Sequence, residues 1–230
     1  WLSEYGDALY MHVGGSPEAL SLIREYKIFD LNEFYRGWYY WRDRNRLAPH
    51  SIYTSSELWQ KALSDYSSQY VVEEYGGWAF NTSTQKQNNR ATPLLSDDDE
   101  LAAEVKITFL APDYVVEWKF NSSTRKYDRY QSGELQRDTS GKKIKADTVI
   151  IQRVKSRVID EIGRLRIDTI GSGEAMVFFD GVKIDGIWKK ESRTDRTRFY
   201  DAIGEEIKLK PGKIWVEIVG QDSEVEIGEI

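Results

Sequence analysis

The chain has 230 residues, enough for one large domain or two small ones, and its 40% apolar and 30% charged residues are an ordinary balance for a globular protein. The net charge of -6 and the pI near 5.2 disfavour nucleic acid as a partner. Cysteine is absent, which excludes disulfides, cysteine metal ligands and cysteine nucleophiles. The aromatic content of 13% suits a β-rich protein or one that presents stacking surfaces.

The chain shows no segment that targets or spans a membrane. No apolar run approaches the length of a membrane span, and the sequence begins at Trp1 with neither an initiator methionine nor a signal peptide. We therefore expect a processed or excised fragment. Membrane association would then occur only through a lipid anchor of the parent protein, which this chain lacks.

The first third of the chain predicts a mixed α/β region. Residues 8–13 form a short apolar run typical of a buried strand, and a glycine turn then leads into a helix from about Glu18 to Tyr26. Ser16 is a suitable N-cap for this helix and Pro17 a suitable first helical residue.

Two further elements are expected before residue 70. Residues 34–43 form the densest aromatic stretch in the chain, which we expect to be extended and partly buried. Thr54 to Glu57 form a capping box, and the apolar residues from Leu58 to Tyr66 then follow helical spacing. A second helix is therefore expected at 58–66.

From residue 76 to residue 100 the chain becomes polar, with Asn88 and Asn89, Thr92 and Pro93, and an acidic run from Asp97 to Glu100. This composition predicts an exposed, mobile crossing between two regions. We accordingly place a domain boundary near residue 100, uncertain by about ten residues.

After residue 100 the sequence predicts β-strands almost throughout. Asp180 and Gly181 form a strong hairpin signal between two of the expected strands, whereas Asp185 and Gly186 indicate a turn or a bulge. The fold predicted is α+β, with a truncated α/β N-terminal region at 1–100 followed by a β-rich domain of consecutive antiparallel hairpins at 101–230. The expected strands are 105–109, 114–120, 126–131, 144–152, 164–170, 175–179, 182–189 and 214–219.

The first candidate site is the glycine turn. Gly14, Gly15 and Ser16 join the expected strand to the helix, so their backbone N–H groups could bind an anion at the positive end of the helix dipole, assisted by His12. The alternative, which we favour, is a turn whose glycines only satisfy its backbone angles. The full glycine pattern of a nucleotide-binding motif is missing.

The second candidate site surrounds the other histidine. Asp43 could orient His50 as an acid/base, with His12 assisting, while Arg42 and Arg46 bind an anion. Trp41 and Tyr53 flank this stretch and are further ligand-binding candidates. An ion-pair network that fixes an irregular loop explains the same residues about equally well.

Other chemistry has weaker signals. No metal site is expected, because the two histidines lack ligand spacing, and no cofactor motif is present. No Gly-x-Ser-x-Gly elbow supports a serine nucleophile. The rings from Trp38 to Trp41 could form a platform for sugars, although core packing is the commoner role. Basic stretches at 125–145 and 193–198 could face an anionic polymer, or could be the solvated faces of hairpins.

Several segments, taken in order, resemble the YerB-like lipoproteins of bacteria. They are Val13–Pro17, Trp41–Asp43, Arg46–His50, Tyr53–Thr54, Gly171–Gly181, Gly186–Lys190, Arg198–Asp201 and Leu209–Trp215. The resemblance implies two adjoining domains of unknown function, the first lacking its front portion here, and an extracytoplasmic, membrane-tethered parent.

The resemblance leads us to expect a non-catalytic binding or scaffolding module of the cell envelope, with an envelope protein or an anionic or glycan polymer as partner. Two alternatives stay open. One is a hydrolase or transferase that acts on an envelope polymer with His50 and Asp43 as its acid-base pair. The other is a glycan-binding surface on the aromatic stretch.

Overall fold

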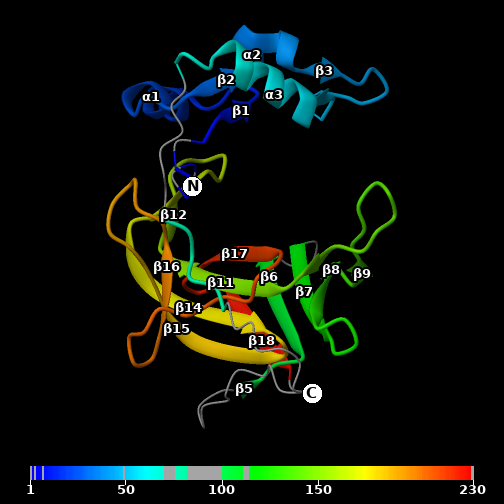
Figure 1. Ribbon diagram of the computed structural model, residues 1–230, viewed down its shortest axis with the longest axis vertical. Helices are drawn as coiled ribbons and strands as arrows, with labels where there is room; N and C mark the ends of the chain where they lie inside the picture. The colour runs from blue at the N-terminus through cyan, green and yellow to red at the C-terminus, as the bar shows by residue number, and fades with distance from the viewer. Residues whose placement is uncertain are drawn as a thin grey trace. The chain divides into compact units, whose positions relative to one another are not determined.

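The computed structural model describes residues 2, 4–6, 8–48, 50–69, 76–81, 100–110 and 114–228. Contacts divide the chain into a first unit, Trp1–Gly76, and a second unit, Gly77–Ile230 (Figure 1). The sequence placed the boundary near residue 100, but residues 77–81 belong by their contacts to the second unit. Most of the expected mobile crossing, including Asn88 to Asp99, lies outside the described residues, as does Pro49.

The first unit is small and mixed. Its core is formed by Leu31, Tyr39 and Ala62, and a parallel pair, β1 with β2, lies beside these residues. A second pair, β3 with β4, is antiparallel. The elements are β1 (Tyr10–His12), α1 (Pro17–Glu25), β2 (Asp30–Asn32), α2 (Glu33–Arg36), the 3-10 helix η1 (Gly37–Tyr39), β3 (Trp41–Arg42), β4 (Ile52–Tyr53) and α3 (Ser56–Asp65).

Local capping explains where these helices begin. The Ser16 hydroxyl accepts a hydrogen bond from the Ala19 backbone, so the predicted cap of α1 is confirmed. At α3 the cap is Ser55, one residue later than expected, because the Thr54 hydroxyl donates to the Tyr39 carbonyl instead. The aromatic stretch was expected to be extended, but Asn32 caps α2 and most of the stretch is helical.

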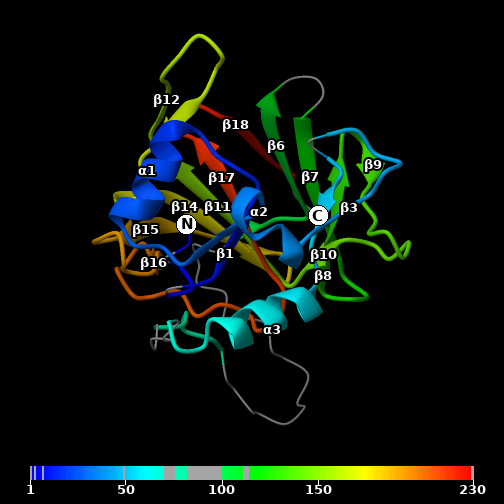
Figure 2. The same ribbon diagram turned by 90° about the horizontal axis from the view of Figure 1, so that it is seen from above.

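The second unit consists of strands. One sheet has the order β10-β8-β7-β6-β18, with β9 paired to β8, and another has the order β16-β15-β14-β11-β17, with β5 paired to β15 (Figures 1 and 2). A separate ribbon joins β12 and β13.

The strand bounds of the first sheet are β6 (Glu104–Leu110), β7 (Tyr114–Asn121), β8 (Lys126–Gln131), β9 (Glu134–Leu135), β10 (Lys145–Ala146) and β18 (Glu224–Gly228). Those of the second sheet and the ribbon are β5 (Glu100–Leu101), β11 (Thr148–Val154), β12 (Ser156–Val158), β13 (Leu165–Ile167), β14 (Gly171–Phe179), β15 (Val182–Lys190), β16 (Arg198–Asp201) and β17 (Ile214–Gly220).

The protein is therefore α+β with several antiparallel sheets, but consecutive hairpins do not describe all of its pairing. β17 runs parallel to β11, with Thr148 opposite Ile214, and β18 pairs with β6. The reason lies in β11, whose residues are buried almost without interruption. A strand covered on both faces belongs in the middle of a sheet, where it needs a neighbour on each side.

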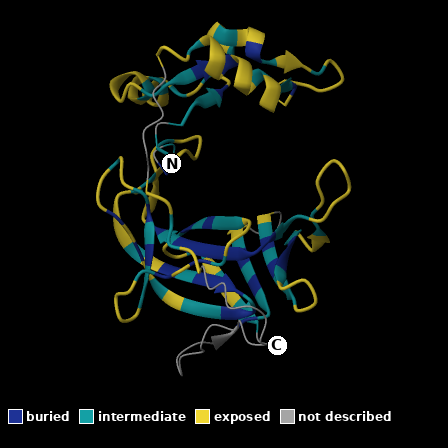
Figure 3. Cartoon of the chain, in the orientation of Figure 1, coloured by how far each residue is buried: buried dark blue, intermediate teal, exposed yellow. Residues whose placement is uncertain are grey.

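Alternating side chains of β11 supply two cores. Val149 and Ile151 point to the first sheet, where they pack with Trp118 and Tyr127. Ile150 points to the opposite face and packs in a second cluster that includes Val177, Trp188, Phe199 and Leu209. Figure 3 shows the resulting dark, buried band through the strands.

Two glycine positions show how tightly β14, β15 and β16 are joined. Asp180 and Gly181 both have positive φ, 55° and 82°, which confirms the predicted hairpin turn between β14 and β15. Gly186, expected in a turn or bulge, instead lies within β15 opposite Ala175 and Asp201. A Cβ atom there would lie 2.0 Å from the Tyr200 carbonyl oxygen, so only glycine fits.

Among the described residues, no helix has both the length and the apolar character needed to cross a membrane.

We predict that Gly186→Ala destabilises the second unit by about 1–3 kcal/mol, because its methyl group would push β16 away from β15. Urea unfolding followed by the amide exchange of β15 and β16 measures the loss. Gly77→Ala is the matched control, since a Cβ there meets nothing within 4 Å. Equal stability of the two variants would contradict the close approach of β16.

Candidate functional site

His12 is held inside the first unit. It lies at the end of β1 with 8% of its surface exposed and is stacked on Tyr10. Its Nδ1 lies 2.6 Å from the Gly14 carbonyl oxygen and its Nε2 lies 2.9 Å from an Asp30 carboxylate oxygen. The ring thus connects the glycine turn to β2, which is what a structural histidine does.

The glycine turn has its own reasons for its sequence. Gly14 has a φ of 64°, and a Cβ on it would lie 3.0 Å from the Phe34 ring. Its backbone N–H donates to the Asn32 side chain, which also accepts from the backbone of Phe34. These contacts join the turn to α2, while anion binding by Gly14, Gly15 and Ser16 stays a prediction.

The second candidate site is a loop between β3 and β4. The Asp43 carboxylate accepts a hydrogen bond from the Asn45 backbone at 2.9 Å, and the Arg42 guanidinium donates to Glu33 at 2.9 Å. His50 is exposed, and the described part of the chain provides no hydrogen bond or ion pair to its ring. The geometry gives Asp43 and Arg42 local partners, and an acid-base role for His50 stays a prediction.

Other residues of this loop do come together. The Arg46 guanidinium donates a hydrogen bond to the Tyr53 hydroxyl and lies over the Tyr53 ring, with 5.8 Å to the ring centroid. Tyr53 in turn stacks on Trp41 across β3 and β4, with 5.9 Å between centroids and 22° between planes. Arg46, Tyr53 and Trp41 thus form a layered aromatic and cationic group at the edge of the first unit.

Exposed aromatic rings continue along the chain from this group. Tyr39 is buried, but the four rings at 34, 35, 38 and 41 have between 46% and 72% of their surface exposed. The Arg36 guanidinium lies over the Trp38 ring at 5.7 Å from its centroid. We call Phe34, Tyr35, Trp38, Trp41 and Tyr53 the aromatic surface.

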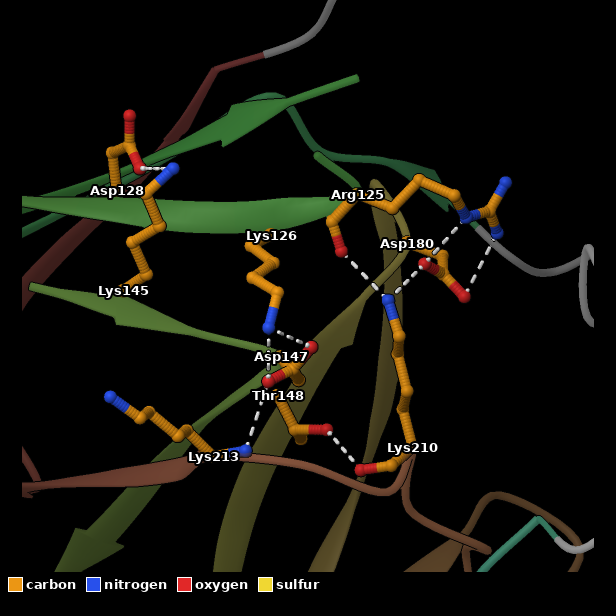
Figure 4. Close-up of polar contacts among 9 residues, drawn as sticks. All are labelled: Arg125, Lys126, Asp128, Lys145, Asp147, Thr148, Asp180, Lys210 and Lys213. Atoms are coloured by element: carbon orange, nitrogen blue, oxygen red, sulfur yellow. Dashed lines mark hydrogen bonds and ion pairs between the residues drawn. The ribbon is translucent and has the colours of Figure 1, made fainter. Parts of the chain in front are cut away.

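The basic stretch near residue 125 belongs to a charge network in the second unit (Figure 4). Asp147 accepts hydrogen bonds from the Lys126 ammonium at 3.1 Å and from the Lys213 backbone at 2.9 Å. Asp180 pairs with Arg125 and Lys210, each within 3 Å. All the carboxylates of this network, including Asp128 with Lys143 and Lys145, are largely buried, so the cations serve first to neutralise them.

The pKa values of two buried acids, Asp147 and Glu217, shift in opposite directions. Burial alone would raise the pKa of Asp147, but hydrogen bonds from Lys213 and Lys126 outweigh it and hold this pKa below its ordinary value of 3.8. Burial wins at Glu217 and raises its pKa, although Trp118 and Arg129 act in the other direction. Sequence reasoning missed both acids, because neither lies in a recognisable motif.

Metal binding finds no support among the residues that the structure describes, where no group of three or more His, Asp or Glu side chains could hold an ion.

We predict that His12→Ala destabilises the first unit by about 1–3 kcal/mol, since it removes two partly buried hydrogen bonds. His50→Ala is the control and should leave stability unchanged, because its ring is exposed and unpartnered within the described residues. Amide exchange of β1 and β2 reports on this unit alone. Unchanged protection in His12→Ala would show that the ring is not a structural link.

We further predict that Asp147 makes the second unit sensitive to acid. A lowered native pKa stabilises the fold above the ordinary value of 3.8, and this contribution is lost as the pH falls below it. Asp147→Asn should therefore cost about 1–3 kcal/mol at pH 7 and less at pH 3. Urea unfolding at both pH values, with exposed Asp222→Asn as the control, measures the difference, and a pH-independent cost would contradict it.

Comparison with known proteins covers both units. The N-terminal and C-terminal domains of the family described as "Protein of unknown function (DUF3048)" match residues 1–69 and 105–216. A Bacillus subtilis (strain 168) protein named "Putative lipoprotein YerB" is 26% identical over 221 residues, which are 95% of this chain and 62% of that protein. The chain thus spans less than two thirds of this relative.

The fold also matches a solved structure. The crystal structure of the YerB protein from Bacillus subtilis superposes with a TM-score of 0.78 at 23% identity, covering 98% of this chain and 72% of that one. At this identity the match concerns the fold alone. Two domains of one family, matched in order, and a relative aligned over nearly the whole chain lead to one assignment: the chain belongs to the YerB-like family.

Proposed function

We propose that the protein is a binding module of the bacterial cell envelope, and that the aromatic surface of its first unit binds carbohydrate. The observation that carries the proposal is the exposure of Trp38 and Trp41, each beside an arginine or an arginine-bound ring. Large aromatic side chains normally fill cores, so a group of them left in solvent marks an interaction surface.

The chemistry of this surface suits a sugar polymer. Flat aromatic faces stack against the apolar faces of sugar rings, while Arg36, Arg42 and Arg46 can donate hydrogen bonds to hydroxyl or carboxylate oxygens. Trp41 and Tyr53 are already stacked, so these two side chains lose little conformational entropy when a ligand binds. A glycan of the envelope is therefore the ligand class we favour over a peptide.

The location we propose is extended from the name of a relative. The Bacillus subtilis relative is named a lipoprotein, and we extend this to the parent of the present chain as an extracytoplasmic protein anchored by lipid. The catalytic alternative receives no support from the geometry, because His12 is engaged by Gly14 and Asp30 and the Asp43 carboxylate binds the Asn45 backbone. A binding role requires none of these groups to react.

We predict that Trp38→Ala and Trp41→Ala each weaken the binding of soluble peptidoglycan fragments by about fivefold, the loss expected for one stacking contact. Isothermal titration calorimetry of the full chain measures the affinity. Trp59→Ala is the matched control, since this tryptophan is similarly exposed but lies on α3 outside the aromatic surface. No binding by the wild type, or equal binding by all variants, would refute the proposal.

A further inference from the structure

A cavity of about 510 Å³ opens in the second unit, and none of the residues considered so far as a site lines it. It lies where β11 ends, between the β12–β13 ribbon, the beginning of β14 and the turn that leads to β18. Its lining includes Arg153, Lys155, Arg166, Thr169, Ser172 and Trp188. Its size falls in the range of pockets that hold small organic ligands.

A glycine makes room for Trp188, one of the residues that line this cavity. A Cβ on Gly173 would lie 2.6 Å from the Trp188 indole nitrogen and 2.7 Å from the Arg153 carbonyl oxygen. Without that atom, the indole of Trp188 crosses β14 and donates a 2.6 Å hydrogen bond to the Arg153 carbonyl. Gly173 thus allows Trp188 to take this position, a role that the sequence alone did not reveal.

Arg153 also lines the cavity. One of its terminal nitrogens donates to the carbonyl oxygens of Gln221 at 3.0 Å and Ser223 at 2.9 Å, and its Nε lies 3.8 Å from Glu174. These contacts tie the turn between β17 and β18 to the end of β11. One terminal nitrogen of Arg153 is therefore engaged by the protein, and its guanidinium lies in the lining of the cavity.

Lys155 and Arg166 are different, because both are exposed and have no hydrogen bond or ion pair from their side chains within the described residues. Arg157 lies directly opposite Arg166 in the ribbon and is equally unpartnered there. Like charges directly opposite each other destabilise a strand pair. In the charge network of Figure 4 each buried carboxylate is paired with cations, whereas no carboxylate within the described residues pairs with Lys155 or Arg166.

The charged residues that line the cavity are also mostly cationic. Three cationic side chains line it, against the single carboxylate of Asp168, although the whole chain carries a net charge of -6. The hydroxyl groups of Thr169 and Ser172 add donors and acceptors for a polar ligand. A cation pair beside hydroxyls, in a space larger than one ion, suits an anionic group on a polar body.

We propose that this cavity binds a small sugar-sized ligand that carries an oxyanion, a phosphate or a carboxylate. Lys155 and Arg166 bind the oxyanion, and the guanidinium of Arg166 can do so through two parallel hydrogen bonds. Thr169, Ser172 and Asp168 contact the ligand's hydroxyl groups. The site is independent of the aromatic surface and does not rest on the function proposed above.

The test is a titration of the full chain with glucose 6-phosphate, glucuronate and glucose, monitored by isothermal titration calorimetry at low salt. We expect saturable binding of at least one of the two oxyanion-bearing sugars and none of glucose. The double variant Lys155→Ala/Arg166→Ala should weaken this binding by about tenfold or more, because it removes the charge-assisted hydrogen bonds. Which sugar binds identifies the oxyanion.

Lys142→Ala/Lys213→Ala is the matched control, since it removes two other exposed cations of the same unit. It should retain wild-type binding, and both double variants should unfold at the wild-type temperature without ligand, which keeps the comparison independent of folding. The inference is overturned if neither oxyanion binds, if glucose binds as tightly as its charged analogues, or if Lys155→Ala/Arg166→Ala binds like the wild type.

Discussion

The second unit depends on one strand. β11 is buried on both faces, and its alternating side chains enter two cores at once, Val149 and Ile151 on one side and Ile150 on the other. Because its backbone pairs with β14 on one edge and β17 on the other, it also joins segments far apart in the sequence. The cavity lies at the end of this strand and is lined by Arg153 and Lys155, on either side of the buried Val154.

Charge is used in two ways in this unit. Where carboxylates are buried, as at Asp147 and Asp180, lysines and arginines surround them and the pairs stabilise the packing of loops on strands. Near the cavity, Lys155 and Arg166 are in solvent and lack such partners within the described part of the chain. The sequence alone does not show which basic residues are paired and which are free in solvent. The paired ones contact buried carboxylates, and these carboxylates come from other parts of the sequence.

Much of the fold was predictable from local patterns. The Asp180–Gly181 hairpin and the Ser16 cap follow from residue types that few other conformations accept. The helical conformation of α2 was not predictable from its aromatic residues, because α2 begins where the Asn32 side chain caps it. The cavity could not be predicted from the sequence either, since Gly173 and Trp188 lie opposite each other only because of the register of β14 with β15.

The parallel pairing of β11 with β17 has a consequence for how the protein is made. The chain must extend past Gly220 before β11 receives its second neighbour, and past Gly228 before β18 completes the edge beside β6. During synthesis, therefore, the backbone N–H and C=O groups along one edge of β11 stay unpaired until β17 has been made. Such long-range closure slows folding and exposes the nascent chain to aggregation.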